Sequence, residues 1–374
     1  MRKAAVKCVF LSEPDMIEAG VLDMHECVRV MDEVFDLLGK GDYLMGGPRE
    51  NEHGVMLYFP QEKRFPKMPL AGPDRRFAAM IAYVGGRFNV CGTKWYGSNV
   101  ENPEVGLPRS ILTVILNDPE TSAPLAIMSG NLVSAMRTGA VPGVAAKYLA
   151  TKGARVCGAI GAGVINRACI MSIAETVKTL EEIRIYDLVP DKATAFAKEV
   201  ASITKTRAIP VRTLEASVVD ADVISIAAAG PKRVAIPAEW LKKGTLVTLT
   251  GTADLPGSCY LENTVVVDHW KMHQAWMTEV GEHPLGINGL FGSTPSAPIL
   301  QLILEGKLRD DHIQSLGDIV SKKIPGRKTD EDTIIFVTGG LPVEDVAWGY
   351  TVYQNALRKK IGQELKYWDA PHWF

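Results

Sequence analysis

The sequence has no CxxC pair and no long run of uncharged apolar residues. Its six cysteines are scattered, several of them within apolar segments, which is typical of buried, reduced thiols rather than of disulfides or a zinc site. No window reaches the roughly 18 uncharged apolar residues that a membrane-spanning helix needs. The N-terminal segment lacks the apolar core and the small-residue cleavage site of a signal peptide. We therefore expect a cytoplasmic protein with no membrane partner.

An excess of either charge is also missing. Lysine and arginine number 41 and aspartate and glutamate 43, so the formal net charge is −2. A nearly neutral chain lacks the basic field that attracts nucleic acid or an anionic membrane surface. We therefore expect no nucleic-acid partner. The 374 residues are enough for two domains and a large core.

The first part of the chain has the pattern of an antiparallel sheet. Residues 23–40 carry apolar side chains at spacings of three and four, which predicts a helix. Strand-like segments follow from residue 80 and end at Asp118-Pro119-Glu120-Thr121, a turn signature. This pattern predicts an antiparallel sheet with a helix packed on it.

The pattern changes after Arg137. A helix of small residues is predicted for Gly139 to Ala150, with Arg137 at its start, and short apolar strands then alternate with longer helices to about residue 300. This alternation is typical of a doubly wound parallel sheet of the Rossmann type. The tail ends in a long helical pattern that we expect to pack back on the first part. The predicted fold is therefore α/β, with a Rossmann domain at 147–319 and a discontinuous α+β domain formed by 1–146 and 320–374.

A glycine turn after the first parallel strand predicts a dinucleotide site. Gly161 permits a tight turn, and Gly163 permits a pyrophosphate to approach the N–H groups of the next helix. A lone GxG motif is weak, so the prediction depends on the strand before it and the helix after it. The third glycine position is occupied by Asn166, which implies looser helix–strand packing or a variant turn.

Asp187 ends the next strand and favours NAD. A carboxylate there can bind the ribose hydroxyls and repel a 2′-phosphate, although a solvated strand-end acid is the alternative. NADP stays open because Lys192 is nearby. The candidate cofactor contacts are Thr138, Gly161, Ala162, Gly163, Val164, Ile165, Asp187 and Ala228.

Four charged residues are candidates for a substrate site. Arginine clamps a carboxylate with two hydrogen bonds, which makes Arg49 and Arg137 candidates for substrate binding. Lys94 lies in the middle of a strand, where a lysine fits if it faces a cleft, and burial there could lower its pKa and suit it to proton transfer. Asp254 lies at the carboxyl end of a parallel strand, where ligands bind in doubly wound sheets. Each residue alone could form a structural ion pair, but the set favours a site that binds an amino or imino acid.

Two histidines have the spacing of metal ligands on a helix. His269 and His273 are four residues apart. Because no third ligand is evident, we expect no metal site.

Several motifs resemble the ornithine cyclodeaminase/μ-crystallin family. They are GTKW at 92–95, NDPETSAPLAIM at 117–128, SAMRTGA at 134–140 and GGLPVEDVAWG at 339–349. The resemblance extends from about residue 8 to about residue 360. GTKWYGSN and IPGR are similar to the subgroup that includes N-(2-amino-2-carboxyethyl)-glutamate dehydrogenases, and also to bacterial proteins named as the second component of a tyramine oxidase.

The resemblance implies site roles and an assembly. It implies a homodimer in which the discontinuous domain carries dimerisation and substrate binding. Arg137 would hold the α-carboxylate, with Arg49 as a second clamp. Lys94 would contact the carboxylate or assist proton transfer. Asp254 would accept the amine proton or bind a distal amine.

The resemblance also implies redox chemistry at a Cα–N bond. The predicted function is an NAD-dependent dehydrogenase or imine reductase acting on an amino acid or N-substituted amino acid. The first alternative is a cyclodeaminase for ornithine or a related diamino acid, in which the hydride returns and ammonia leaves. The second is a ligand-binding or accessory protein without activity. Segment 60–88 is longer and more basic than expected, which puts ornithine in doubt; it could serve a second carboxylate or be a solvated loop.

Overall fold

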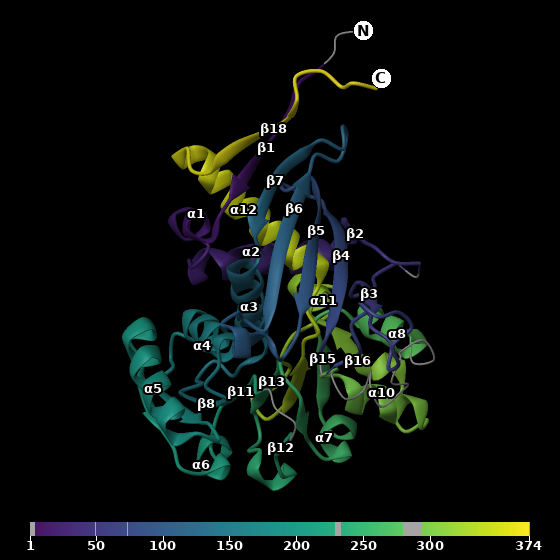
Figure 1. Ribbon diagram of the computed structural model, residues 1–374. Coiled ribbons are helices and arrows are strands. Elements are labelled where there is room, and N and C mark those ends of the chain that lie inside the picture. Colours follow the sequence, from purple (N-terminus) through teal and green to yellow (C-terminus); the bar gives the residue numbers. More distant parts are fainter. Residues whose placement is uncertain (1–3, 49, 73, 229–232, 280–293, 374) are drawn as a thin grey trace. The chain divides into compact units, whose positions relative to one another are not determined.

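The computed structural model describes residues 4–48, 50–72, 74–228, 233–279 and 294–373 (Figure 1). They form two compact units. The first unit comprises Met1–Asp23, Gly41–Ser134 and Leu341–Phe374, and the second comprises Met24–Lys40 and Ala135–Gly340. Within the described ranges, no helix is long and apolar enough to cross a membrane.

The first unit is built on an eight-stranded sheet. Its neighbours pair antiparallel except β1 and β7, which are parallel. The order is β18 (Gln363–Trp368), β1 (Val6–Leu11), β7 (Pro124–Ser129), β6 (Ser110–Asn117), β5 (Val90–Ser98), β4 (Arg76–Val84) and β2 (Tyr43–Met45), with β3 (Val55–Tyr58) also on β4. The predicted, mainly antiparallel sheet is therefore confirmed.

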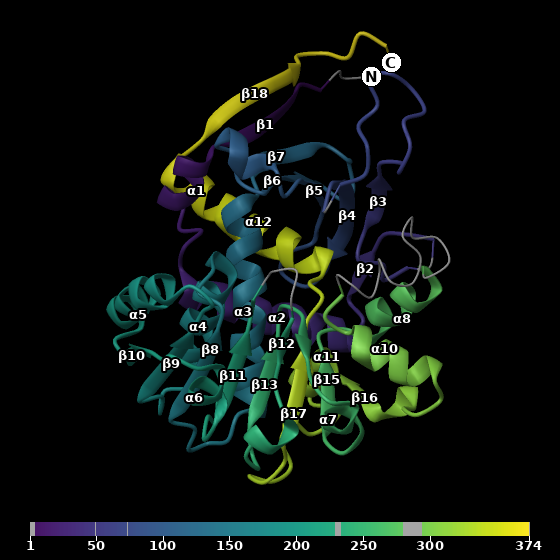
Figure 2. The ribbon, with the colours of Figure 1, turned by 60° about the horizontal axis from the view of Figure 1, so that its bottom comes forward.

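Helix α12 (Pro342–Lys359) packs on this sheet, against β2, β4, β5 and β6 (Figure 2). Along much of β4 and β5, buried side chains alternate with more exposed ones, because neighbouring residues of a strand point to opposite faces of the sheet. Two short elements complete the unit: α1 (Glu13–Glu18), which Ser12 and Asp15 cap reciprocally, and the 3-10 helix η1 (Asn102–Val105).

The helix predicted for residues 23–40 exists but belongs to the second unit. It is α2 (Met24–Lys40), and it packs on α4 (Val164–Thr176) and α11 (Leu316–Val320). A Cβ at Gly39 would overlap the carbonyl oxygen of Gly317, so the two glycines let α2 and α11 approach closely. The helix that packs on the antiparallel sheet within the first unit is α12, from the tail.

The second unit contains an eight-stranded sheet in which every neighbouring pair is parallel. The order is β10 (Arg207–Pro210), β9 (Glu182–Tyr186), β8 (Val156–Ile160), β11 (Val223–Ile226), β13 (Leu246–Leu249), β17 (Ile334–Val337), β15 (Thr264–Val267) and β16 (Ile313–Ser315). The chain runs outward from β8 to β9 and β10 and then restarts with β11 on the other side. Such a reversal is the topological switch point at which doubly wound sheets bind ligands.

Strand β17 corrects the predicted domain boundary. The sequence places 320–374 in the discontinuous domain, but β17 pairs with β13 and β15 inside the parallel sheet. All four of its residues are buried, since a strand inside a parallel sheet is covered on both faces. The second unit therefore continues to Gly340 and also includes residues 24–40 and 135–146.

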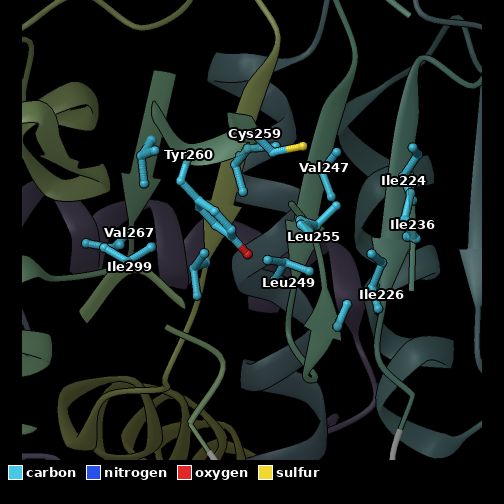
Figure 3. Close-up of a cluster of buried hydrophobic side chains, with 14 of the residues drawn as sticks. Ile224, Ile226, Ile236, Val247, Leu249, Leu255, Cys259, Tyr260, Val267 and Ile299 are labelled. Atoms are coloured by element: carbon cyan, nitrogen blue, oxygen red, sulfur yellow. The ribbon is translucent and has the colours of Figure 1, made fainter. Parts of the chain in front are cut away.

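Helices and a buried apolar cluster surround the parallel sheet. Side chains from β11, β13 and β15 pack with α7 (Gly257–Leu261) and α10 (Ala297–Leu304), including Tyr260 and Ile299 (Figure 3). The other helices among the described residues are α3 (Asn131–Leu149), α5 (Pro190–Thr204), α6 (Leu214–Val218), α8 (Trp270–Glu279), η2 (Ala238–Trp240) and η3 (Asp310–His312). A separate short ribbon pairs β12 (Val234–Ala235) with β14 (Ala253–Asp254).

Candidate active site

The glycine turn after β8 has the backbone of a dinucleotide site. Gly161 has a φ of +95°, and a Cβ there would lie 3.0 Å from the Cα of Ala228, just beyond the end of β11. Only glycine adopts this conformation readily, so Gly161 fixes both the turn and the approach of the two strands. Gly163 precedes the first turn of α4 and has no side-chain cap, and a Cβ on it would meet no atom within 4 Å. The N-terminus of α4 thus has open space beside it, which fits a pyrophosphate.

Asp187 follows β9 and holds this turn. One carboxylate oxygen accepts a hydrogen bond from the N–H of Ala162 at 2.8 Å, and the other accepts one from Val189 at 2.9 Å. Lys192 is exposed on the first turn of α5. The structure therefore brings Gly161, Ala162, Asp187 and Ala228 together at the carboxyl ends of β8, β9 and β11. Val164 and Ile165 belong to the first turn of α4, the former exposed and the latter half-buried.

Asn166 makes a variant turn rather than loose packing. Its side chain is fully buried and donates hydrogen bonds to the carbonyl oxygens of Ile160 and Gly161, at 3.1 and 2.6 Å. Its amide oxygen accepts one from the hydroxyl of Ser225 on β11, at 2.7 Å. Where the usual motif has a glycine for close packing, this chain uses an amide that bonds the turn to the neighbouring strand.

Arg137 lies in the middle of α3, not at a helix start. The helix begins at Asn131, whose side chain accepts a hydrogen bond from the N–H of Leu112 and donates one to the carbonyl of Ser110, at 2.9 Å each. The helix also continues through Pro142. Arg137 is 4% exposed, and a Cβ on Gly340 would lie 2.5 Å from its Nη1 atom. The guanidinium group therefore lies directly against the backbone of Gly340.

The SAMRTGA glycine has a packing role. A Cβ at Gly139 would overlap Ala168 on α4, and one at Gly143 would lie 2.5 Å from the Cβ of Ser172. The Ser172 hydroxyl donates a hydrogen bond to the carbonyl of Gly139 at 2.6 Å. Small residues at positions four apart thus seat α3 against α4, while Arg137 and the half-buried Thr138 precede this contact.

Lys94 is buried on the face of β5 that α12 covers. Its Nζ lies 2.8 Å from Oδ2 of Asp345 and donates a hydrogen bond to the hydroxyl of Ser134 at 3.3 Å. The two side chains of the ion pair are 3% and 0% exposed. Sequence reasoning predicted the lysine but missed Asp345 and Ser134. The acidic pair in the GGLPVEDVAWG motif was the available signal, since two acids inside an apolar helix need a partner.

The other predicted residues have different surroundings. Asp254 is in β14 and 59% exposed, with one carboxylate oxygen 3.6 Å from Nη1 of Arg233. It is in the second unit with Arg137, whereas Lys94 is in the first. Arg49 lies outside the described residues. His273 is engaged by Asp268 and Ser296, and the described part of the chain holds no group of three residues that could bind a metal ion.

Comparison with known proteins gives one consistent result. A model of the ornithine cyclodeaminase/mu-crystallin family matches residues 21–360. The chain is 30% identical over 294 residues to the N-((2S)-2-amino-2-carboxyethyl)-L-glutamate dehydrogenase of Staphylococcus aureus, covering 78% of this chain and 82% of that protein.

Two solved structures share the fold over nearly the whole chain. The Δ1-pyrroline-2-carboxylate reductase of Thermococcus litoralis, in complex with NADH and L-proline, superimposes with a TM-score of 0.77 at 25% identity, covering 95% of this chain and 99% of that one. An archaeal alanine dehydrogenase dimer with bound NAD gives 0.78 at 26% identity, with 97% and 100% covered. Together with the glycine turn and the quoted motifs, the family match shows that this chain belongs to the ornithine cyclodeaminase/mu-crystallin family.

Proposed function

We propose that the protein is an NAD-dependent oxidoreductase acting on the Cα–N bond of an amino acid or N-substituted amino acid. The carrying observation is that one unit holds both an open dinucleotide-type turn at Gly163 and the buried guanidinium of Arg137. The relatives support this function, because a dehydrogenase of an N-substituted glutamate, an alanine dehydrogenase and a pyrroline-2-carboxylate reductase all bear names of C–N redox enzymes.

The turn residues fit a dinucleotide. Gly161, Gly163, Val164 and Ile165 would hold the pyrophosphate at the N-terminus of α4, and Ala228 would line the same edge of the sheet. Asp187 would bind the ribose and disfavour NADP, although Lys192 leaves NADP as the second choice. NAD, when bound, supplies the acceptor or donor of a hydride.

The chain's own residues would bind the substrate and move its proton. Arg137 would clamp the α-carboxylate, with Arg49 as a second clamp. Lys94, held by Asp345 and Ser134, would contact the carboxylate or shuttle a proton at Nζ. Asp254 would accept the amine proton. Oxidation removes a hydride from Cα and a proton from nitrogen and leaves an imine, which water converts to an oxo acid and a free amine or ammonia.

Absorbance at 340 nm with NAD and a panel of amino acids and N-carboxyalkyl amino acids tests the function, with an ammonia assay on the same samples. NADH formation with ammonia or amine release supports the dehydrogenase. Ammonia without net NADH identifies the cyclodeaminase that the family name also suggests. NADH binding with no turnover in either direction, imine reduction included, contradicts both and favours a ligand-binding or accessory role.

The outer face of the antiparallel sheet supports a homodimer. Ile81, Trp95 and Ile111 on neighbouring strands are 49%, 46% and 48% exposed, and the ring of Phe77 stacks on Trp95 with 5.5 Å between centroids. Contiguous exposed apolar side chains mark a protein interface. Because the related archaeal alanine dehydrogenase is a dimer, we assign this face to a second copy of the chain.

Six cysteines without disulfides fit the proposed cytoplasmic location.

A further inference from the structure

Asp268 is a buried carboxylate with five hydrogen-bond donors around it. It follows β15 directly and is fully buried. One oxygen accepts from the N–H groups of Gly339 and Gly340, at 2.7 and 2.9 Å, and from the hydroxyl of Thr338 at 3.0 Å. The other oxygen accepts from the N–H of His269 and from Nε2 of His273, at 2.8 and 2.7 Å. One side of the carboxylate thus faces the 338–340 turn and the other faces α8.

The turn that Asp268 binds is wedged between α8 and Arg137. A Cβ on Gly339 would lie 2.5 Å from the indole of Trp276 and 2.6 Å from Cε of Met272. A Cβ on Gly340, whose φ is +81°, would lie 2.5 Å from Nη1 of Arg137. The backbone of Gly340 therefore lies against the guanidinium, while that of Gly339 lies against α8. Both N–H groups donate hydrogen bonds to Asp268, which holds this backbone in place.

His273 binds the carboxylate oxygen of Asp268 that does not face the 338–340 turn. It is fully buried, its Nδ1 lies 2.8 Å from the hydroxyl of Ser296, and its ring packs edge-on against Trp276. Burial acts to raise the pKa of Asp268, but His273 and the hydrogen bonds from His273, Gly340 and Gly339 outweigh it and lower the pKa to about 2. The ionised form fits this site, because both oxygens of a carboxylate can accept the hydrogen bonds that surround them.

We propose that Asp268, supported by His273, is a positioning residue that sets the orientation of Arg137 through the Gly339–Gly340 turn. The inference rests on the proposed role of Arg137 as the clamp for the substrate carboxylate. An arginine side chain has many rotamers, and a bidentate clamp needs one of them held fixed. The turn supplies this restraint without touching the substrate, and Asp268 holds the turn.

The test is a double-mutant cycle between Asp268→Asn and Arg137→Lys, measured as KM for the best substrate of the amino-acid panel. The amide group introduced by Asp268→Asn has one oxygen acceptor instead of two. It can accept hydrogen bonds either from the turn or from His269 and His273, but not from both sides. In the wild-type background Asp268→Asn should raise KM about tenfold or more, since small misplacements of a binding group are costly. With Arg137→Lys the same change should raise KM by only about twofold, because the positioned group is already gone. The Kd for NADH, measured by fluorescence, should stay the same.

Two further variants keep the result clear. Thr338→Val removes one donor at similar size and should raise KM in the same direction, which tests the idea if Asp268→Asn does not fold. Asp311→Asn, at an exposed pair with Arg309 in the same unit, should leave KM unchanged. The proposal would be overturned if Asp268→Asn raised KM by the same factor in the wild type and in Arg137→Lys. An unchanged KM in a folded Asp268→Asn protein would also overturn it.

A silent substrate panel would instead contradict the proposed function. In that case, crystal structures of the wild type and of Asp268→Asn test the positioning role. The turn and the Arg137 guanidinium should shift together in the variant. A turn that moves without the guanidinium, or no movement of either, would contradict the role.

Discussion

At the residue scale, the Lys94–Asp345 pair makes a strong stability prediction. Both side chains are almost completely buried, so removing one partner leaves the other charge buried. Lys94→Met should lower the free energy of unfolding by about 3–5 kcal/mol, whereas Lys94→Met combined with Asp345→Leu should recover much of the loss. Denaturant unfolding of the wild type, both single variants and the double variant measures this. A double variant that loses the sum of the two single losses would show that the pair does not interact energetically.

His269 predicts an acid sensitivity. Burial, with smaller contributions from Lys271 and His273, lowers its pKa to about 4 despite the opposing effect of Asp268. In the unfolded chain this histidine has an ordinary pKa near 6.5, so the unfolded state takes up the proton first as the pH falls. The contribution of the neutral imidazole to the free energy of unfolding is therefore complete above about pH 6.5 and is lost as the pH falls toward 4. The loss should reach about 3 kcal/mol. In His269→Gln, unfolding midpoints at pH 7 and pH 4.5 should differ less than in the wild type; equal pH dependence would contradict this assignment.

At the element scale, the contact between α3 and α4 depends on Gly139. Gly139→Ala adds a methyl group that overlaps Ala168, so the helices must separate. We expect a loss of about 1–3 kcal/mol in the free energy of unfolding. Gly153→Ala is the matched control, because a Cβ there meets nothing within 4 Å and should change stability by less than about 0.5 kcal/mol. Thermal unfolding of both variants measures the difference, and similar midpoints would exclude the tight contact.

The helices and strands show which parts of the fold can be predicted from the sequence. The glycine turn and the parallel sheet can be predicted because strand, turn and helix follow each other locally. The start of α3 cannot, because Gly139 and Pro142 normally indicate the end of a helix, and here tertiary packing on α4 overrides them. The partner of Lys94 is equally hidden, since Asp345 lies near the other end of the chain and only the folded unit brings the two together.

At the scale of the whole molecule, the exposed face of the antiparallel sheet predicts the assembly. Replacing Ile81 and Trp95 together with glutamate would place charges in the proposed dimer interface, so the wild type should elute as a dimer and the variant as a monomer. Light scattering coupled to size-exclusion chromatography measures the mass. Val105→Glu, at a residue that is 73% exposed on η1, is the control and should remain a dimer. A dimeric Ile81→Glu/Trp95→Glu protein would place the interface elsewhere.

The position of β17 has a consequence for synthesis on the ribosome. β17 is near the end of the chain, yet it lies between β13 and β15, and the other sheet takes β18 and its covering helix α12 from the same region. Neither unit is complete until the segment from β17 to β18 has been synthesised. Until then the nascent chain exposes the apolar edges of β13 and β15, a state prone to aggregation. A premature stop before Ile334 would leave both units without a strand, so even a truncated product that lacks no predicted cofactor residue should fail to fold.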